Sequence, residues 1–286
     1  MICVTGAGGT VGNQLVRQLV EHSVPFRAAY HSDNKASAAR ARHVDAFVID
    51  YHQPESLRAA FQGCEVLFLL GPNLVDQTRL ELNAVEAAKA AGIRHVVKQS
   101  VMGAAEEAYS LAKLHRPVEQ ALETSGMTWT LLRPNSFMQN AVTFMAATIK
   151  AESAFYSASG QARISHVDVR DIAAVALQAL TESGHANKAY TLTGPEALSY
   201  DELAAELSSA LGRTISHVSL PPDDLKQALL AERMPDELAE RMLDLERYFR
   251  EDRASRVTDD IRRVTGHQPR RLAEFVLETA VSGAWG

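Results

Sequence analysis

Short apolar runs alternate with helix-like stretches along the first 135 residues. Gly12–Glu21 places Leu15, Val16, Leu19 and Val20 on one face, and the Ala- and Leu-rich stretch Asp76–Ala91 ends at Gly92, a residue typical of helix ends. The apolar runs between such stretches are Ile2–Thr5, Phe26–Tyr30, Ala46–Asp50, Val66–Leu70, His95–Ser100 and Thr128–Leu132. Alternation of near-continuous apolar strands with helices predicts a parallel sheet covered on both faces.

The second half of the chain is richer in helix. Ile164–Ile172 reads as a short strand running into a helix that ends near Thr181, and Lys188–Thr193 reads as another strand. Ser199 and Glu202 have capping-box spacing, and apolar residues repeat at helical spacing over Asp236–Arg250. We predict an α/β fold with a Rossmann-type doubly wound parallel sheet and a small helix-rich C-terminal lobe. The sheet domain spans residues 1–150 and recruits strands near 164–168 and 188–193; the lobe, 151–286, does not fold independently.

Composition and net charge limit the classes of partner that this protein is expected to bind. Hydrophobic residues make up 46% and charged residues 22% of the 286, which is ordinary for a globular protein. The net charge of −6 argues against nucleic acid as a partner. The charge is uneven, because residues 1–150 carry 14 basic and 13 acidic residues while residues 151–286 carry 15 and 22.

The sequence also gives an expectation for where the protein is located and for whether it binds a metal. No apolar run approaches the roughly 20 residues that cross a bilayer, and the first run starts at Ile2, so we expect a cytoplasmic protein with no membrane partner. Cys3 and Cys64 are expected to be buried, reduced thiols. The histidines show no metal-ligand spacing, so no metal site is expected.

The strongest motif is a glycine-rich turn between the first strand and the first helix. Gly6, Gly9 and Gly12 have G-x-x-G-x-x-G spacing and enclose Thr10 and Val11. The first glycine permits a tight turn, the second a close approach to a pyrophosphate, and the third close packing of helix on strand. The helix N-terminus supplies free N–H groups to the phosphates. We therefore predict a dinucleotide site within residues 1–150.

The second strand suggests which nicotinamide cofactor binds. An NAD site usually has an acid at this strand tip, but here His31 and Ser32 follow Tyr30, and Asp33 lies further on. His31, Ser32 and Lys35 could surround a 2′-phosphate, so NADP(H) is expected in preference to NAD(H). An ordinary polar turn is the alternative.

The ends of the third and fourth strands should complete the cofactor site. Asp50-Tyr51 closes the third strand, where an Asp commonly meets the adenine amino group in this fold, and Leu70-Gly71 closes the fourth, where backbone passes along the cofactor. Both lie at the carboxyl edge of the sheet, where ligands bind.

Three residues after the fifth strand are catalytic candidates. Ser100 is followed by Tyr109 and Lys113, a Y-x-x-x-K pair of the kind short-chain reductases use as proton donor and cofactor-ribose ligand. Pro117 complicates this reading, because it falls inside a helix that begins before Tyr109, whereas a helix beginning at Pro117 leaves Tyr109 on a loop. Tyr109 is then either the proton donor or a loop aromatic over the site.

Several segments together resemble one family. They are Thr5–Gly12, Gln53–Leu57, Gly92–Val97, His115 with Glu119, Ser125–Pro134 followed by Phe137–Asn140, and Thr181–Tyr190. Over nearly its whole length the chain resembles the NmrA-like atypical short-chain dehydrogenases/reductases, and is similar to the branch that holds triphenylmethane reductase and NADPH:quinone oxidoreductase.

The resemblance implies an NADP(H)-binding domain and a lobe that closes a substrate cleft. It implies that Lys113 contacts the cofactor ribose and that residues after the sixth strand line the cleft. Many members lack the tyrosine, so Tyr109 departs from the commonest pattern. We expect the substrate to contact residues after the sixth strand and in the loops after the fourth and fifth strands. These residues are Asn73, Met102, Asn135, Phe137 and Met138.

His115, Glu119 and Arg133 admit two readings. His115 and Glu119, four apart, could be a general acid and its orienting partner, but a structural role is favoured because that helix packs on the sheet. For Arg133, a buried ion pair with an acid of the C-terminal lobe is the expectation.

Two functions remain in view. The first is an NAD(P)H-dependent reductase that transfers hydride to a small aromatic or conjugated acceptor, such as a quinone, dye, enone, iminium or carbonyl. The alternative is a non-catalytic NADP(H)-sensing regulatory protein. An epimerase is disfavoured because the serine-rich segment it needs is reduced to Ser100. The acceptor's identity and the choice between monomer and homodimer stay open.

Overall fold

The computed structural model describes residues 1–285, and the chain groups into two compact units. The first unit consists of residues 1–105, 112–133 and 169–191, and the second of residues 106–111, 134–168 and those from 192 onward. This grouping differs from a single boundary after residue 150, because residues 169–191 lie with the first unit and residues 134–150 with the second.

The first unit contains a seven-stranded sheet. Its strands, in the order β3-β2-β1-β4-β5-β6-β8, are β3 (Asp45–Val48), β2 (Phe26–Tyr30), β1 (Ile2–Val4), β4 (Val66–Leu69), β5 (His95–Gln99), β6 (Thr128–Pro134) and β8 (Lys188–Leu192). The pairs among β1 to β6 are parallel. Strand order reverses at β1, which lies between β2 and β4, and such a switch point is where open α/β sheets bind ligands. The predicted Rossmann-type doubly wound fold is confirmed.

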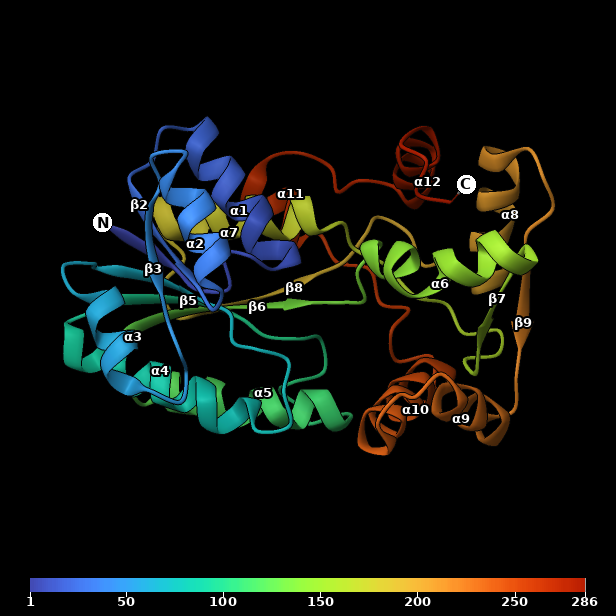
Figure 1. The fold of residues 1–286 in the computed structure, drawn as a ribbon, viewed down its shortest axis with the longest axis horizontal. Helices are drawn as coiled ribbons and strands as arrows, with labels where there is room; N and C mark the ends of the chain where they lie inside the picture. Colours follow the sequence, from blue (N-terminus) through green and yellow to red (C-terminus); the bar gives the residue numbers. More distant parts are fainter. Residues whose placement is uncertain (286) are drawn as a thin grey trace. The chain divides into compact units, whose positions relative to one another are not determined.

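Helices cover both faces of this sheet (Figure 1). Helices α1 (Thr10–Glu21) and α7 (Val169–Thr181) pack together on one face, where Leu15 and Leu19 of α1 are fully buried. Helices α3 (Pro54–Phe61), α4 (Gln77–Ala91) and α5 (Ser110–Glu123) lie on the other. The remaining helix, α2 (Asp33–Arg40), follows β2. Cys3 and Cys64 are buried and free, as predicted.

One predicted strand does not join the sheet. Of the two later stretches, that near 188–193 forms β8, whereas residues 164–168 make only isolated bridges, from Ile164 to Leu198 and from Val167 to Phe137. This segment passes close to Gly194, where an added Cβ would lie 2.1 Å from the His166 carbonyl oxygen. The segment is therefore held by neighbours within the second unit instead of by a strand of the sheet.

The second unit is mainly helical. Its helices are α6 (Gln139–Glu152), α8 (Tyr200–Leu211), α9 (Pro222–Ala231), α10 (Asp236–Arg250), α11 (Asp260–Thr265) and α12 (Leu272–Val281), and its strands β7 (Ala154–Ser157) and β9 (Ser216–Ser219) form a parallel pair. The predicted capping box is confirmed, since Ser199 and Glu202 exchange side-chain and backbone hydrogen bonds at the start of α8.

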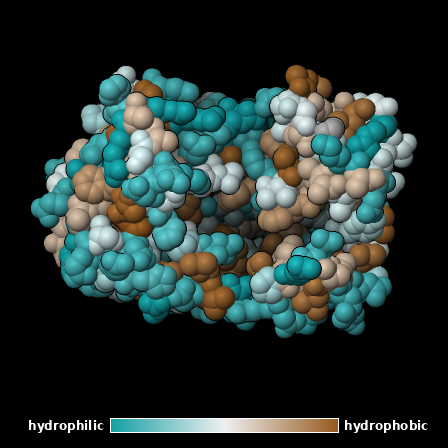
Figure 2. All heavy atoms as spheres, viewed as in Figure 1, coloured by the Kyte–Doolittle hydropathy of each residue, from teal (hydrophilic) through white to brown (hydrophobic). Residues whose placement is uncertain are grey.

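The surface is predominantly hydrophilic on the face shown in Figure 2, with hydrophobic residues in separate groups. Within residues 1–285, none of the helices combines the length and apolar character needed to cross a membrane.

Candidate functional site

The glycine turn at the end of β1 leaves room that a side chain would fill. Gly6 has φ of 64°, a conformation that favours glycine. A Cβ on Gly12 would lie 2.1 Å from the Gly6 carbonyl oxygen, so α1 approaches the turn as closely as only glycine allows. The N-cap of α1 is Gly9, which supplies no side-chain cap to the first N–H groups. An uncapped helix start behind a glycine turn fits an anionic phosphate, and the predicted cofactor residues Gly6, Gly9, Thr10, Val11 and Gly12 all lie in this cradle.

The end of β4 packs against this turn. A Cβ on Gly6 would lie 3.0 Å from Leu70 atoms. The Thr5 hydroxyl donates to the Phe68 carbonyl at 3.0 Å and accepts the Leu70 N–H at 2.9 Å, while the Tyr51 hydroxyl donates to the Leu70 carbonyl at 2.8 Å. The structure thus brings Tyr51, Leu70 and Gly71 together, with the Tyr51 hydroxyl engaged by the backbone of β4's end.

The carboxylate of Asp50 lies nearer the surface than the buried Tyr51 side chain. It accepts the backbone N–H of His52 at 2.9 Å and the Gln53 amide at 3.0 Å. These hydrogen bonds, the first above all, lower the pKa of Asp50. The side chain is therefore an ionised acceptor at the carboxyl end of β3.

The end of β2 presents a cation to the glycine turn. Ser32 is the N-cap of α2, where its hydroxyl accepts the Lys35 N–H at 3.5 Å. The Lys35 ammonium donates to the Gly8 carbonyl at 3.1 Å, and His31 is exposed. Positive charge therefore lies beside the turn, next to the N-terminus of α2, while the Asp33 side chain is 77% exposed.

Ser100 and Lys113 have contrasting surroundings in the first unit. Ser100 is fully buried, and its hydroxyl donates to Glu119 at 2.7 Å. Lys113 is exposed on α5, and no hydrogen bond or ion pair to its side chain is found among residues 1–285. Lys113 is therefore free to meet a ligand, whereas the Ser100 proton is committed to Glu119.

Arg133 pairs with Glu119 and not with an acid of the second unit. Its guanidinium donates to both carboxylate oxygens, at 2.9 and 2.8 Å. Burial opposes ionisation of Glu119, but the bonds from Arg133 and Ser100 outweigh it and lower the pKa. The expected partner of Arg133 was wrong because α5 brings Glu119 against β6 within one unit, a proximity no sequence spacing reveals.

Helix α5 follows neither alternative that Pro117 suggested. It runs from Ser110 to Glu123 with Pro117 in its interior. The Thr78 hydroxyl donates to the Leu114 carbonyl at 2.8 Å, satisfying a group in the turn that the proline ring disturbs. At the helix start, Asp244 accepts the Ser110 N–H at 2.6 Å.

Tyr109 directly precedes this helix and belongs to the second unit, while Lys113 belongs to the first. Its ring packs on Tyr248, with centroids 4.7 Å apart. Tyr109 is 5% exposed, and burial raises the pKa of its hydroxyl. A tyrosine activated by a neighbouring lysine would have a lowered pKa, and the raised pKa of Tyr109 is the opposite.

The predicted substrate residues are distributed over both units. Asn73 is exposed and Met102 buried in the first unit. In the second, the Asn135 amide donates to Ser165 and to the Ala254 carbonyl, both at 2.8 Å, and Phe137 bridges Val167. Asn135 therefore ties three segments of the second unit together.

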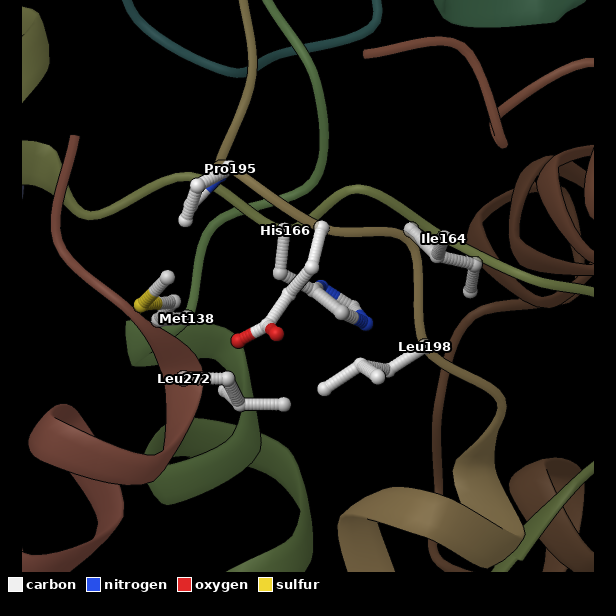
Figure 3. A pocket seen from close by; sticks show the side chains of 7 residues that line it. Met138, Ile164, His166, Pro195, Leu198 and Leu272 are labelled. Carbon is white, nitrogen blue, oxygen red and sulfur yellow. The ribbon is translucent and has the colours of Figure 1, made fainter. Parts of the chain in front are cut away.

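Met138 lines two small recesses of the second unit. Figure 3 shows the first, in which the His166 ring lies among Met138, Leu198 and Leu272. Neither ring nitrogen of His166 has a hydrogen-bond partner. Burial lowers the pKa of His166 to about 4, so the imidazole is neutral at pH 7.

Sequence reasoning missed one hydrogen-bonded chain in the second unit. The His217 ring lies 2.8 Å from the Ser157 hydroxyl and 2.7 Å from the Asp201 carboxylate, a Ser-His-Asp order like that of serine hydrolases. Ser157 is only 2% exposed, and the Ser159 hydroxyl donates to it at 3.2 Å. These hydrogen bonds therefore link β7, β9 and α8 to one another, and the buried Ser157 hydroxyl is not accessible as a nucleophile for a substrate.

The fold and the glycine turn define a dinucleotide-binding protein of Rossmann type. Within that class, residues 1–276 match the model of the NmrA-like family, and the chain belongs to this family.

Among curated proteins, the chain is 39% identical over 276 residues to NAD(P)H azoreductase of Xenophilus azovorans, covering 96% of both chains. Among solved structures, it is similar to the NADPH-dependent quinone oxidoreductase of Escherichia coli complexed with NADPH, with a TM-score of 0.90, 30% identity and coverage of 97% and 99%. It is also similar to triphenylmethane reductase of Citrobacter sp. complexed with NADP(H), with a TM-score of 0.89, 28% identity and coverage of 98% and 100%.

Proposed function

We propose that this chain transfers hydride from NADP(H), in preference to NAD(H), to a small aromatic or conjugated acceptor, such as a quinone, an azo or triphenylmethane dye, an enone, an iminium or a carbonyl compound. In its broader form, the protein is an NAD(P)H-dependent oxidoreductase of the short-chain dehydrogenase/reductase type. The observation that carries the proposal is the glycine turn, whose close approach to α1 and uncapped helix start fit a pyrophosphate.

The cofactor supplies the hydride when it is bound. The chain's own residues bind and orient it: the turn and the start of α1 hold the pyrophosphate, and Asp50 and the backbone at Leu70 and Gly71 border its adenosine and ribose parts. We propose Lys113 as a further ligand, since this exposed ammonium has no partner among residues 1–285. The named reductases among the relatives favour this function over the non-catalytic sensor.

The preference for NADP(H) rests on the charges that follow β2. Lys35, held 3.1 Å from the Gly8 carbonyl, and His31 stand where an NAD site usually has an acid. A 2′-phosphate adds negative charge there, which a lysine ammonium stabilises.

Cofactor titrations test this preference. Lys35→Met should raise the dissociation constant of NADPH about tenfold and leave that of NADH within twofold, since one charge-assisted contact is worth about 1.5 kcal/mol. Lys89→Met, on the exposed end of α4, is the matched control and should change neither. If Asp33→Ala abolishes NADH binding and spares NADPH binding, Asp33 is a ribose ligand and the preference is for NAD(H).

Turnover tests the reaction. NADPH oxidation, followed by absorbance, should proceed with at least one member of a panel of quinones, azo and triphenylmethane dyes and cyclic imines. Lys113→Ala should suppress it strongly. Tyr109→Phe should retain it, because that hydroxyl is buried with a raised pKa. NADPH binding without oxidation by any acceptor would instead establish the sensor.

A further inference from the structure

A lysine lies in the middle of the buried sheet of the first unit. Lys98, on β5, and Glu81, on α4, are both fully buried, and the Lys98 Nζ lies 2.9 Å from Glu81 Oε1. Replacing a buried ion pair with apolar residues is often neutral or stabilising, so stability alone is a weak reason for such a pair.

The carboxylate of Glu81 reaches the end of β4. Its Oε1 accepts the Gly71 N–H at 2.9 Å. A Cβ on Gly71 would lie 2.4 Å from Glu81 Cγ, so the side chain of Glu81 presses directly on the Gly71 backbone. The neighbouring Leu70 contacts Gly6 of the glycine turn. A shift of Glu81 would therefore move Gly71 and Leu70, and with them the cradle.

The ammonium of Lys98 is held on all sides. Its three acceptors are Glu81 Oε1, the Gln99 carbonyl and His115 Nδ1, the last at 3.2 Å. Burial, with the adjacent Lys98 charge, keeps the pKa of His115 well below its usual value, so the neutral ring can accept this proton. The other ring nitrogen of His115 lies 3.2 Å from the Gln77 amide. Residues from α4, β5 and α5 thus fix the ammonium, and the ammonium fixes Glu81.

We infer that Glu81 is a positioning residue, which holds the Gly71 amide and with it the end of β4 in the form that binds the dinucleotide, and that Lys98 compensates the buried charge of this carboxylate. This inference rests on the proposed function, because the site it positions is the NADP(H) site. The hydrogen bond from the partly buried Gly71 N–H is lost when the acceptor is removed, and a donor that is left unmet away from water is costly.

Two double variants separate positioning from stability. Glu81→Gln with Lys98→Met removes both charges but leaves a carbonyl oxygen for the Gly71 N–H. Glu81→Met with Lys98→Met removes the charges and the acceptor while keeping a side chain of similar length. NADPH dissociation constants are measured by cofactor fluorescence, well below the melting temperature of each protein.

The variant that keeps the acceptor should bind NADPH within threefold of the wild type, and the variant without it about tenfold more weakly. Equal dissociation constants in the two variants would overturn the inference, since a merely structural pair would change the melting temperatures without distinguishing the two variants in NADPH binding. If neither variant folds, Glu81→Asp retains the charge and withdraws the acceptor; it should weaken NADPH binding severalfold, and unchanged binding would overturn the inference. Absence of NADPH binding by the wild type refutes the proposed function itself, which distinguishes the two failures.

Discussion

His166 should make the stability of the second unit depend on pH. The residue is 7% exposed, its ring nitrogens have no hydrogen-bond partners, and burial lowers its pKa to about 4 from the ordinary 6.5. Replacing it with phenylalanine, a ring of similar shape, removes the titrating group and both unmet nitrogens. The substitution tests whether the buried imidazole is what weakens the fold in mild acid.

The magnitude follows from the two pKa values. The native state binds the proton less tightly than the unfolded state, so stability is full above pH 6.5 and falls as the pH drops toward 4. At about 1.36 kcal/mol per pKa unit, the complete loss is about 3 kcal/mol, and about 2 kcal/mol is already lost at pH 5 relative to pH 8.

Urea unfolding at pH 8 and pH 5 measures this loss. A Trp129→Phe background leaves Trp285, which is fully buried in the second unit, as the fluorescent reporter of that unit. His166→Phe should lose about 2 kcal/mol less than the parent between the two pH values. His267→Gln, which removes an exposed histidine, should behave like the parent. If the parent and His166→Phe lose the same stability, the buried imidazole does not govern the acid response; His166→Leu repeats the comparison should phenylalanine not fit.

Three further substitutions follow from individual contacts. Gly12→Ala places a Cβ 2.1 Å from the Gly6 carbonyl oxygen and should weaken NADPH binding at least tenfold in a fluorescence titration. Gly63→Ala meets nothing within 4 Å, and its φ of 77° should cost stability while NADPH affinity stays at the wild-type value. Glu119→Ala leaves Arg133 and Ser100 without their shared acceptor. Because Arg133 is partly exposed, we expect a decrease of about 2 to 3 kcal/mol in the free energy of unfolding measured in urea, at the low end for a buried ion pair. A decrease below about 1 kcal/mol contradicts this account. Pro117→Ala restores an N–H for the Lys113 carbonyl inside α5 and should raise the free energy of unfolding by about 1 to 2 kcal/mol, and a decrease would show that the proline conformation is preferred there.

The sheet was predictable because its evidence is local. Apolar runs such as Val66–Leu70, a glycine turn between strand and helix, and the capping box at Ser199 are each visible within a few residues. Parallel pairing follows from that alternation because parallel strands need crossover connections.

What could not be predicted depends on partners far apart in sequence. Pro117 is accommodated inside α5, where the Thr78 hydroxyl donates to the Leu114 carbonyl in the turn before it. Arg133 pairs with Glu119, which lies on the same helix. Lys98 did carry a signal, as a charge within an apolar strand, but its spacing from Glu81 has no helical or strand period. The orphaned nitrogens of His166 arise only from burial in the folded unit.

The return of α7 and β8 to the first unit has a consequence for synthesis on the ribosome. Helix α1 at residues 10–21 packs on α7 at residues 169–181, and β8 is the outermost strand beside β6. The sheet begun by the first residues therefore stays unfinished, with one edge open and one face partly bare, until about residue 191 has emerged. During that interval residues 134–168 of the other unit are already out of the tunnel, so the first unit is completed while the second, which needs the residues from 192 onward, is still only partly synthesised.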